Sequence, residues 1–285
     1  MRLTINIATR GRPALLTETI IRTLPNLSLP ETVLMISADQ DDQPTIDALK
    51  AMKSSRLLVS IKPREDSRGE KYDRALTEAP ADLYLPAADY GPFLTPGFDK
   101  RIIDAAIWPD GIGVVYGPMC DELVPMFQVP TAKFVAKIGY IFSHEYPFWF
   151  IDHELADIAW MIGRINFCDV HMDVSKRPGK TTRLRELNFW TAYYDFMALD
   201  RRVKARSVIM ADDFEAPPWL KHQLCNWHPL TEKRSENRNA RVRGSAAHCE
   251  EHRGESGPPD EGYLRAKEKA ERKLNELYTA LRAAA

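Results

Sequence analysis

The stretch that decides the fold is DLYLPAADYGPFLTPGFD, residues 82–99. It opens with an apolar segment, residues 83–85, that has the character of a buried strand. A turn-rich segment with several Pro and Gly residues follows, and it carries one acid, Asp89, near its start. In open α/β sheets, ligands bind outside the carboxyl ends of the strands. We therefore expect Asp89 to emerge at a binding site.

Segments of strand and helix character alternate on both sides of this stretch. Apolar runs predict strands at 3–8, 33–37, 57–61, 83–85, 113–116 and 166–172. Helical periodicity predicts helices at about 13–23, 45–52, 70–79, 96–107, 131–138, 152–162 and 181–203. This alternation is typical of parallel βαβ units. We therefore predict an α/β fold with a mostly parallel central sheet that is covered by helices.

The composition changes near residue 231. Residues 231–262 are rich in charged residues, Gly, Ser, Asn and Pro but hold almost no apolar side chains. Such a segment cannot bury enough surface to offset its chain entropy. Residues 263–285 regain leucines at helical spacing. We predict one domain over 1–230, a disordered linker over 231–262, and a C-terminal helix over 263–285. That helix either docks on the domain or pairs with a partner, for example in an oligomer.

The composition of the whole chain argues against several classes of protein. A formal net charge of -1 provides no overall field for nucleic acid or anionic membranes. No apolar run approaches the roughly 20 residues that span a bilayer, and the N-terminus lacks the apolar region of a signal peptide. The four cysteines lie far apart, without the paired spacing of a disulfide framework or zinc site. We therefore expect a cytoplasmic protein.

Polar residues follow the first two predicted strands. Thr9, Arg10 and Arg12 lie at a strand-to-helix turn, where backbone N–H groups favour anions and arginines can bind a diphosphate. Asp39 and Asp41 follow the second strand and can accept hydrogen bonds from a base or a ribose. The alternatives are a solvated basic turn and acids that merely favour a helix N-terminus.

Three further residues are candidates for contact with phosphates or a metal. Lys71 lies in the first turn of a predicted helix, where its charge conflicts with the helix dipole, and this conflict favours a functional role. A Mg²⁺ or Mn²⁺ ion beside a diphosphate takes one or two carboxylates, and Asp89 is the candidate. Tyr90 and Gly91 stand where a second acid is expected, so a turn-forming role for Asp89 is the alternative. His171 is a possible additional ligand, although a lone histidine is more often structural.

Two acids open a predicted helix after an aromatic segment. Asp152 and Glu154 follow Trp149 and Phe150, and acids in a first helical turn stabilise the helix dipole. The functional alternative is a general base in an aromatic pocket. The residues alone leave both interpretations open.

Taken in order, these segments resemble the family 2-like glycosyltransferases of GT-A fold. The resemblance extends from about residue 3 to residue 202. It is carried by the segments 9–13, 39–42, 71–76, 83–99, 138–141 and 149–152. It implies a single Rossmann-like GT-A domain, with 9–13 as the nucleotide loop and Asp89 at the metal site. It also implies that the helix at 152–162 supplies the catalytic base, Asp152, with Glu154 as the alternate.

The activity that this resemblance implies is transfer of a hexosyl group from a nucleotide-diphosphate sugar to an acceptor hydroxyl, with inversion. The cofactor would be Mn²⁺ or Mg²⁺ on Asp89, with His171 as a possible second ligand. A glycan, a lipid-linked glycan, a protein or a modified DNA base could be the acceptor. Two other functions stay open: a sugar nucleotidyltransferase, and a non-catalytic sugar-nucleotide-binding or scaffold protein with a degenerate metal motif.

Overall fold

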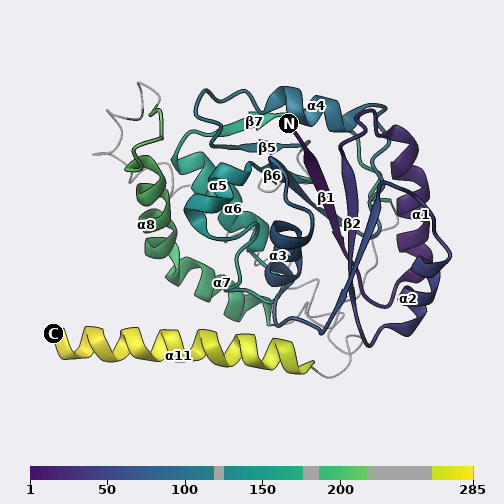
Figure 1. Ribbon diagram of the computed structural model, residues 1–285. Helices are drawn as coiled ribbons and strands as arrows, with labels where there is room; N and C mark the ends of the chain where they lie inside the picture. The colour runs from purple at the N-terminus through teal and green to yellow at the C-terminus, as the bar shows by residue number, and fades with distance from the viewer. Residues whose placement is uncertain (119–124, 176–185, 217–219, 221–258, 285) are drawn as a thin grey trace.

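The central feature of the computed structural model is a parallel sheet of four strands (Figure 1). The structure describes residues 1–118, 125–175, 186–216, 220 and 259–284. The strands, in the order β3-β2-β1-β4, are β1 (Leu3–Ala8), β2 (Val33–Asp39), β3 (Leu57–Lys62) and β4 (Leu83–Ala88). All neighbouring pairs are parallel, so the four carboxyl ends lie along one edge, the lower edge in Figure 1. The predicted α/β fold with a mostly parallel central sheet is confirmed.

A smaller sheet lies beside the first and contains a strand that the sequence did not predict. Its order is β6-β5-β7, and its strands are β5 (Val114–Tyr116), β6 (Gln128–Pro130) and β7 (Ile165–Phe167). β5 pairs antiparallel with β6 and parallel with β7. β6 has only three residues and ends at a proline, so it shows no alternation that a pattern could reveal. β7 is likewise shorter than the predicted strand at 166–172.

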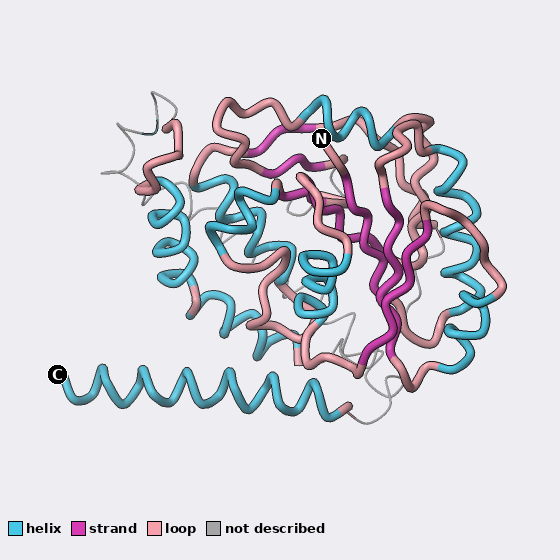
Figure 2. The backbone as a smooth tube through the Cα atoms, in the orientation of Figure 1, coloured by secondary structure: helices cyan, strands magenta, loops and turns pink. Residues whose placement is uncertain are grey.

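Helices cover both faces of the central sheet (Figure 2). α1 and α2 lie on one face, and α3 lies on the other with α5 and α6 beyond it (Figure 1). The helices are α1 (Pro13–Thr23), the short 3₁₀ helix η1 (Leu24–Asn26), α2 (Gln43–Lys50), α3 (Arg68–Glu78), α4 (Phe98–Ala105), α5 (Ala132–Ile138), α6 (Ile151–Met161), α7 (Leu187–Phe196), α8 (Ala198–Ile209) and α11 (Glu261–Ala284). Each face of the sheet has its own buried apolar cluster, one around Ile5 and Ile20 and the other around Met35 and Tyr72.

The prediction of one long helix at 181–203 is wrong in its extent. Residues 181–185 lie outside the described residues, and the remainder forms two helices, α7 and α8, that meet at Met197. Met197 has a ψ of 9° and a buried side chain. No Pro or Gly marks this position, so tertiary packing interrupts a helical pattern that is continuous in the sequence.

The stretch 82–99 anchors the sheet to the loop before β2. Its final residue, Asp99, is fully buried and accepts hydrogen bonds from the backbone N–H groups of Ser28 and Leu29 at 3.0 and 2.8 Å. The hydroxyl of Thr32 donates a further bond of 3.0 Å to the same carboxylate. Gly97 has a φ of 66°, the left-handed conformation that glycine adopts without strain, so α4 starts at Phe98. The geometry of this turn is therefore set by Asp99, whose role is structural.

The C-terminal helix α11 docks on the body of the protein. Tyr263, Ala266 and Ala270 are buried, and Trp190 on α7 donates a hydrogen bond of 3.2 Å from Nε1 to the Tyr263 hydroxyl. The helix starts at Glu261, before the predicted residue 263, because Asp260 caps it by accepting a bond from the Tyr263 N–H.

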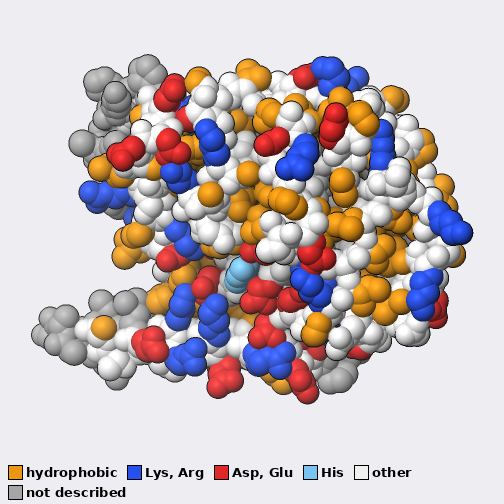
Figure 3. Space-filling view, viewed as in Figure 1, with side chains coloured by type: hydrophobic (Ala, Val, Ile, Leu, Met, Phe, Trp, Pro, Cys, Tyr) orange, Lys and Arg blue, Asp and Glu red, His pale blue; other side chains and the backbone are white. Residues whose placement is uncertain are grey.

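Charged pairs line the contact between α11 and the body. Arg64 contacts Asp260 at 2.7 Å, Arg265 contacts Asp66 at 2.6 Å, and Lys273 contacts Glu145 at 2.9 Å. Figure 3 shows basic and acidic side chains gathered where the helix meets the body. These contacts support docking, the first of the two alternatives for this segment, while a role in oligomerisation stays a prediction.

A charge introduced at the docked face should detach α11. We expect Ala270→Asp to lower the free energy of unfolding by about 2–3 kcal/mol, because Ala270 is 1% exposed and an unpaired carboxylate there cannot be solvated. Thermal unfolding and tryptic cleavage at the lysines of α11 measure the effect. Glu268→Ala, on the exposed face of the same helix, is the control and should change stability by less than about 0.5 kcal/mol. Equal cleavage of both variants and the parent would argue against docking.

Other predictions concern regions that the structure describes only in part. Residues 231–258 of the predicted linker lie outside the described residues, so the predicted boundaries stay predictions. Cys168 is buried and free, and Cys120, Cys225 and Cys249 also lie outside the described residues. Within the described ranges, no helix is long and apolar enough to cross a membrane. The cytoplasmic location stays a prediction.

Candidate active site at the carboxyl edge of the sheet

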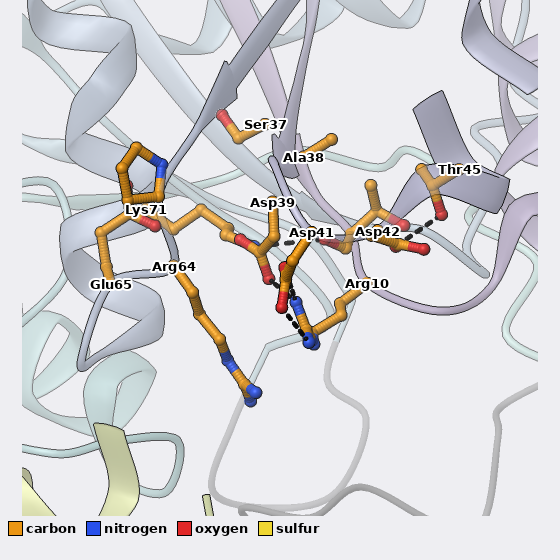
Figure 4. Close-up of polar contacts among 12 residues, drawn as sticks. Arg10, Ser37, Ala38, Asp39, Asp41, Asp42, Thr45, Arg64, Glu65 and Lys71 are labelled. Carbon is orange, nitrogen blue, oxygen red and sulfur yellow. Dashed lines mark hydrogen bonds and ion pairs between the residues drawn. The ribbon is translucent and has the colours of Figure 1, made fainter. Parts of the chain in front are cut away.

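Asp39 is the centre of a charged cluster at the carboxyl end of β2 (Figure 4). Its carboxylate is fully buried, and Arg10 Nη1 lies 3.0 Å from Oδ2 while Lys71 Nζ contacts Oδ1. Lys71 also donates a hydrogen bond of 3.2 Å to the carbonyl of Thr9. Burial lowers the pKa of Lys71, and the neighbouring Asp39 carboxylate opposes that shift. The structure thus brings together predicted residues from the loop after β1, the end of β2 and the start of α3.

The loop after β2 divides its acids between two roles. Asp41 forms a pair of bonds with Arg10, of which the Nη2–Oδ2 bond is 2.8 Å, and this hydrogen bonding lowers the pKa of Asp41 to about 2. Asp42 accepts bonds of 2.6 Å from the backbone N–H of Gly11 and from the Thr45 hydroxyl. Asp42 therefore holds the two loops together, while Asp41 and Arg10 lie at the more exposed rim of the cluster.

Asp89 lies beside Thr9, because Ala8 and Ala88 pair in register at the ends of β1 and β4. The carboxylate is fully buried, and burial raises the pKa of Asp89 despite its charged neighbour, Arg12. The Thr9 hydroxyl donates a bond of 2.8 Å to Oδ2, and Arg12 Nε lies 3.0 Å from the same oxygen. Within the described residues, Oδ1 is buried without a hydrogen-bond partner. One oxygen of Asp89 is therefore held by the protein, and the other is available to a cation.

This geometry suits a metal ion that is held mainly by phosphate oxygens. Mg²⁺ beside a diphosphate commonly takes one or two protein carboxylates, and Asp89 Oδ1 can supply one. The described part of the chain has no group of three or more His, Cys, Asp or Glu residues that could form a protein-only metal site. His171 is exposed, and its backbone carbonyl accepts a bond of 3.0 Å from the Leu94 N–H, which places its segment against the loop after Asp89. Its role as a ligand stays a prediction.

Arg68 is a candidate that the sequence reasoning missed. It is the first residue of α3, and its guanidinium lies 5.3 Å from the ring centre of Tyr72 and 5.4 Å from that of Phe148. The Tyr72 hydroxyl donates a bond of 3.0 Å to the carbonyl of Ala87, two residues before Asp89. Burial opposes the charge of Arg68, but Tyr72, Tyr90 and Asp89 outweigh it and raise the pKa of Arg68. The signal was available, since a basic residue in a first helical turn had singled out Lys71 on the same helix.

Asp152 and Glu154 lie in different surroundings although both belong to the first turn of α6. The Asp152 side chain is 40% exposed, and its Oδ1 lies 2.9 Å from His153 Nδ1. Burial favours the neutral acid, but the charge and hydrogen bond of His153 outweigh it and lower the pKa of Asp152. Before the helix, Phe150 has a φ of 69°, a strained conformation for a residue other than glycine and one that clusters at functional sites.

Glu154 instead points into the interface between α6 and α8. It is fully buried, and its Oε1 contacts the Tyr140 hydroxyl and lies 2.9 Å from Lys204 Nζ. Burial and the adjacent Glu154 carboxylate raise the pKa of Tyr140, so its hydroxyl stays a proton donor. Of the two acids, Asp152 is therefore the accessible one, and the contacts of Glu154 are those of a packing residue.

The architecture places this chain in a known structural class. No protein-family model matches the sequence, and no curated protein matches it. The fold is that of the GT-A glycosyltransferases, as predicted, and solved structures share it at low sequence identity.

Two solved structures illustrate the similarity. TarS 1-349 from S. aureus has a TM-score of 0.53 at 15% identity, covering 76% of this chain and 67% of that chain. The mannosyltransferase PcManGT from Pyrobaculum calidifontis, in complex with GDP-Man and Mn²⁺, has a TM-score of 0.53 at 11% identity, covering 98% of this chain and 82% of that chain. TarS 1-349 has also been solved with UDP-GlcNAc.

Proposed function

We propose that this protein transfers a hexosyl group from a nucleotide-diphosphate sugar to an acceptor hydroxyl. The observation that supports it most is the convergence of Thr9, Arg10, Asp39, Lys71 and Asp89 at one edge of the sheet. Ligands bind at this edge in open α/β sheets. The carboxylates of Asp39 and Asp41 suit the base and ribose of the donor. The cationic groups of Arg10, Arg12 and Lys71 suit its diphosphate.

The proposed reaction is an in-line displacement with inversion at the anomeric carbon. Asp152 takes the proton from the acceptor hydroxyl as its oxygen attacks that carbon. The bond from the anomeric carbon to the diphosphate oxygen breaks, and the nucleoside diphosphate leaves with the electron pair. A Mn²⁺ or Mg²⁺ ion on Asp89 Oδ1, with His171 as the candidate second ligand, would neutralise charge on the diphosphate. The preorganised cations of the protein act on the same charge.

The surroundings of Asp89 favour a second candidate function, the binding of sugar nucleotides without catalysis. Its Oδ2 already contacts Arg12, and no acid follows it at Tyr90 or Gly91. A non-catalytic protein that binds sugar nucleotides, or a scaffold, would need no second acid. A nucleotidyltransferase would instead need a glycine-rich opening loop, and the loop after β1 has only Gly11.

A thermal-shift screen of UDP, GDP and their sugar derivatives, with Mn²⁺ and with EDTA, tests donor binding. A ligand that binds only the folded state stabilises it by about 2.7 kcal/mol at 100 times its Kd, so one nucleotide series should raise the unfolding midpoint in proportion to the logarithm of its concentration above Kd. We expect the largest shift with Mn²⁺. The absence of a shift with every nucleotide at millimolar concentration would contradict the proposed function. Binding without turnover would favour the non-catalytic alternative.

A further inference from the structure

We propose that Arg68 and Arg12 form an arginine pair that binds the diphosphate of the donor. This pair would account for most of the preference for a diphosphate over a monophosphate. This inference rests on the proposed function and assigns a role to Arg68 in it. The pair would contribute positive charge at the position where a second metal-site acid is missing. Asp89 would then serve partly as the residue that holds one of these cations.

Arg12 is fixed by contacts on two sides. Its Nε lies 3.0 Å from Asp89 Oδ2, and its guanidinium carbon lies 5.8 Å from the centre of the Tyr90 ring. The side chain is 28% exposed, so part of it can reach a ligand at the edge of the sheet. The buried carboxylate therefore orients the arginine without removing it from the site.

Arg68 is fixed by aromatic contacts and a well-capped helix. Its guanidinium packs near the rings of Tyr72 and Phe148, and its backbone N–H donates a bond of 3.3 Å to the carbonyl of Pro147. Ser67 and Glu70 form a capping box that defines the start of α3 around it. The Tyr72 ring that Arg68 contacts is itself tied to β4, because its hydroxyl donates a hydrogen bond to the carbonyl of Ala87, two residues before Asp89. Arg68 is therefore preorganised toward the end of β4.

The charges at this position are unbalanced in favour of an anion. Within the described residues, Asp89 forms an ion pair with Arg12, whereas Arg68 forms none with any carboxylate. A cation in the first turn of a helix is also opposed by the helix dipole, and both costs are relieved when an anion binds. A guanidinium can donate two parallel hydrogen bonds to the oxygens of a phosphate. An ionised carboxylate has no hydrogen to donate and cannot bind a phosphate in this way. The guanidinium of Arg68, which forms no ion pair with a described carboxylate, thus matches a diphosphate.

Calorimetric titrations that compare a nucleoside diphosphate, its monophosphate and the free nucleoside test the pair. The uridine series (UDP, UMP and uridine) and the guanosine series (GDP, GMP and guanosine) are the probes. We expect Arg68→Gln to weaken diphosphate binding by about 10- to 100-fold, the range for lost charged hydrogen bonds, and to leave nucleoside binding unchanged. Arg68→Lys should recover part of the loss because it keeps the charge but not the planar fork.

Three controls keep this result interpretable. Arg101→Gln removes an exposed arginine on α4 and should change no affinity, and unfolding midpoints check that each variant folds. Each titration is repeated in EDTA, where the parent should keep most of its preference for diphosphate over monophosphate.

Equal affinities of Arg68→Gln and the parent for the diphosphate would overturn the inference. The inference would also be overturned if the preference for diphosphate over monophosphate disappeared in EDTA but survived in Arg68→Gln. The metal, and not Arg68, would then be the source of that preference. If the parent binds no nucleoside, nucleotide or sugar nucleotide at all, the proposed function itself fails, and this outcome is distinct from both.

Discussion

Replacing Asp152 with Asn should lower turnover by about 10²–10⁴-fold, the usual contribution of a general base, while donor affinity stays within a few-fold of the parent. Asn keeps an oxygen for the contact with His153 and for the first turn of α6. It cannot accept the proton of the acceptor hydroxyl. Steady-state kinetics with a saturating donor, together with calorimetric titration of the nucleoside diphosphate, separate the loss of turnover from any loss of binding.

The pH dependence gives a second test of this role. The pKa of Asp152 is lowered by His153, so the base is ionised at neutral pH and loses its activity only when the pH falls through that lowered pKa. The acid limb of kcat/KM should therefore lie below the ordinary pKa of an aspartate, about 3.9. An acid limb near pH 6 would argue for a different base.

Glu154→Gln is the matched control on the same helix turn. Glu154 is buried against Lys204, so this substitution should reduce stability more than turnover. Near-normal turnover in Asp152→Asn, combined with an inactive but folded Glu154→Gln, would contradict the assignment and transfer the base to Glu154.

Replacing Asp99 with Ala should lower the free energy of unfolding by about 3–5 kcal/mol, the cost of removing one partner from a buried charged network. Asp99 is fully buried, and it accepts bonds from Ser28, Leu29 and Thr32. Its loss leaves backbone N–H groups in the loop before β2 without an acceptor. Denaturant titration measures the change, and Asp99→Asn should cost less because an amide oxygen can still accept.

Asp104→Ala is the control on the same helix. Asp104 forms an exposed pair with Lys100 in α4, and such pairs contribute at most about 0.5 kcal/mol. A cost for Asp99→Ala that is no larger than this would contradict the role of Asp99 as the anchor of stretch 82–99.

The contribution of Asp99 should also depend on pH. Burial alone would raise its pKa, but the hydrogen bonds from Ser28, Leu29 and Thr32 outweigh burial and lower the pKa of Asp99. A lowered pKa in the folded state stabilises the protein above the unfolded-state pKa, and this stabilisation disappears as the pH falls through the folded-state value. The stability difference between the parent and Asp99→Asn should therefore shrink below about pH 4.

Much of the fold was predictable because its main signal is local. The four strands of the central sheet are short apolar runs bounded by turn residues, and each was placed within a few residues. The antiparallel strand β6 and the break at Met197 were not predictable. A three-residue strand has no period, and a helix interrupted by packing shows no breaker residue in its sequence.

The candidate site was likewise predictable only in part. The neighbourhood of Asp39 and Asp89 follows from strand order, because parallel strands end at one edge. Asp152 is exposed and Glu154 is buried because only one side of α6 meets α8. The sequence of the first helical turn does not show which side that is. Arg68 carries the same first-turn signal as Lys71, but its contact with Phe148 and its link through Tyr72 to the end of β4 come from distant segments that the sequence alone does not bring together.

The most direct test of the account is the release of nucleoside diphosphate from the nucleotide sugar that stabilises the protein most. We expect slow release without an acceptor, since water can replace the hydroxyl, and we expect the rate to fall sharply in Asp152→Asn. Saturable binding of the donor with no release in the parent, even with Mn²⁺ and a panel of glycan acceptors, would contradict the claim that this protein is a glycosyltransferase.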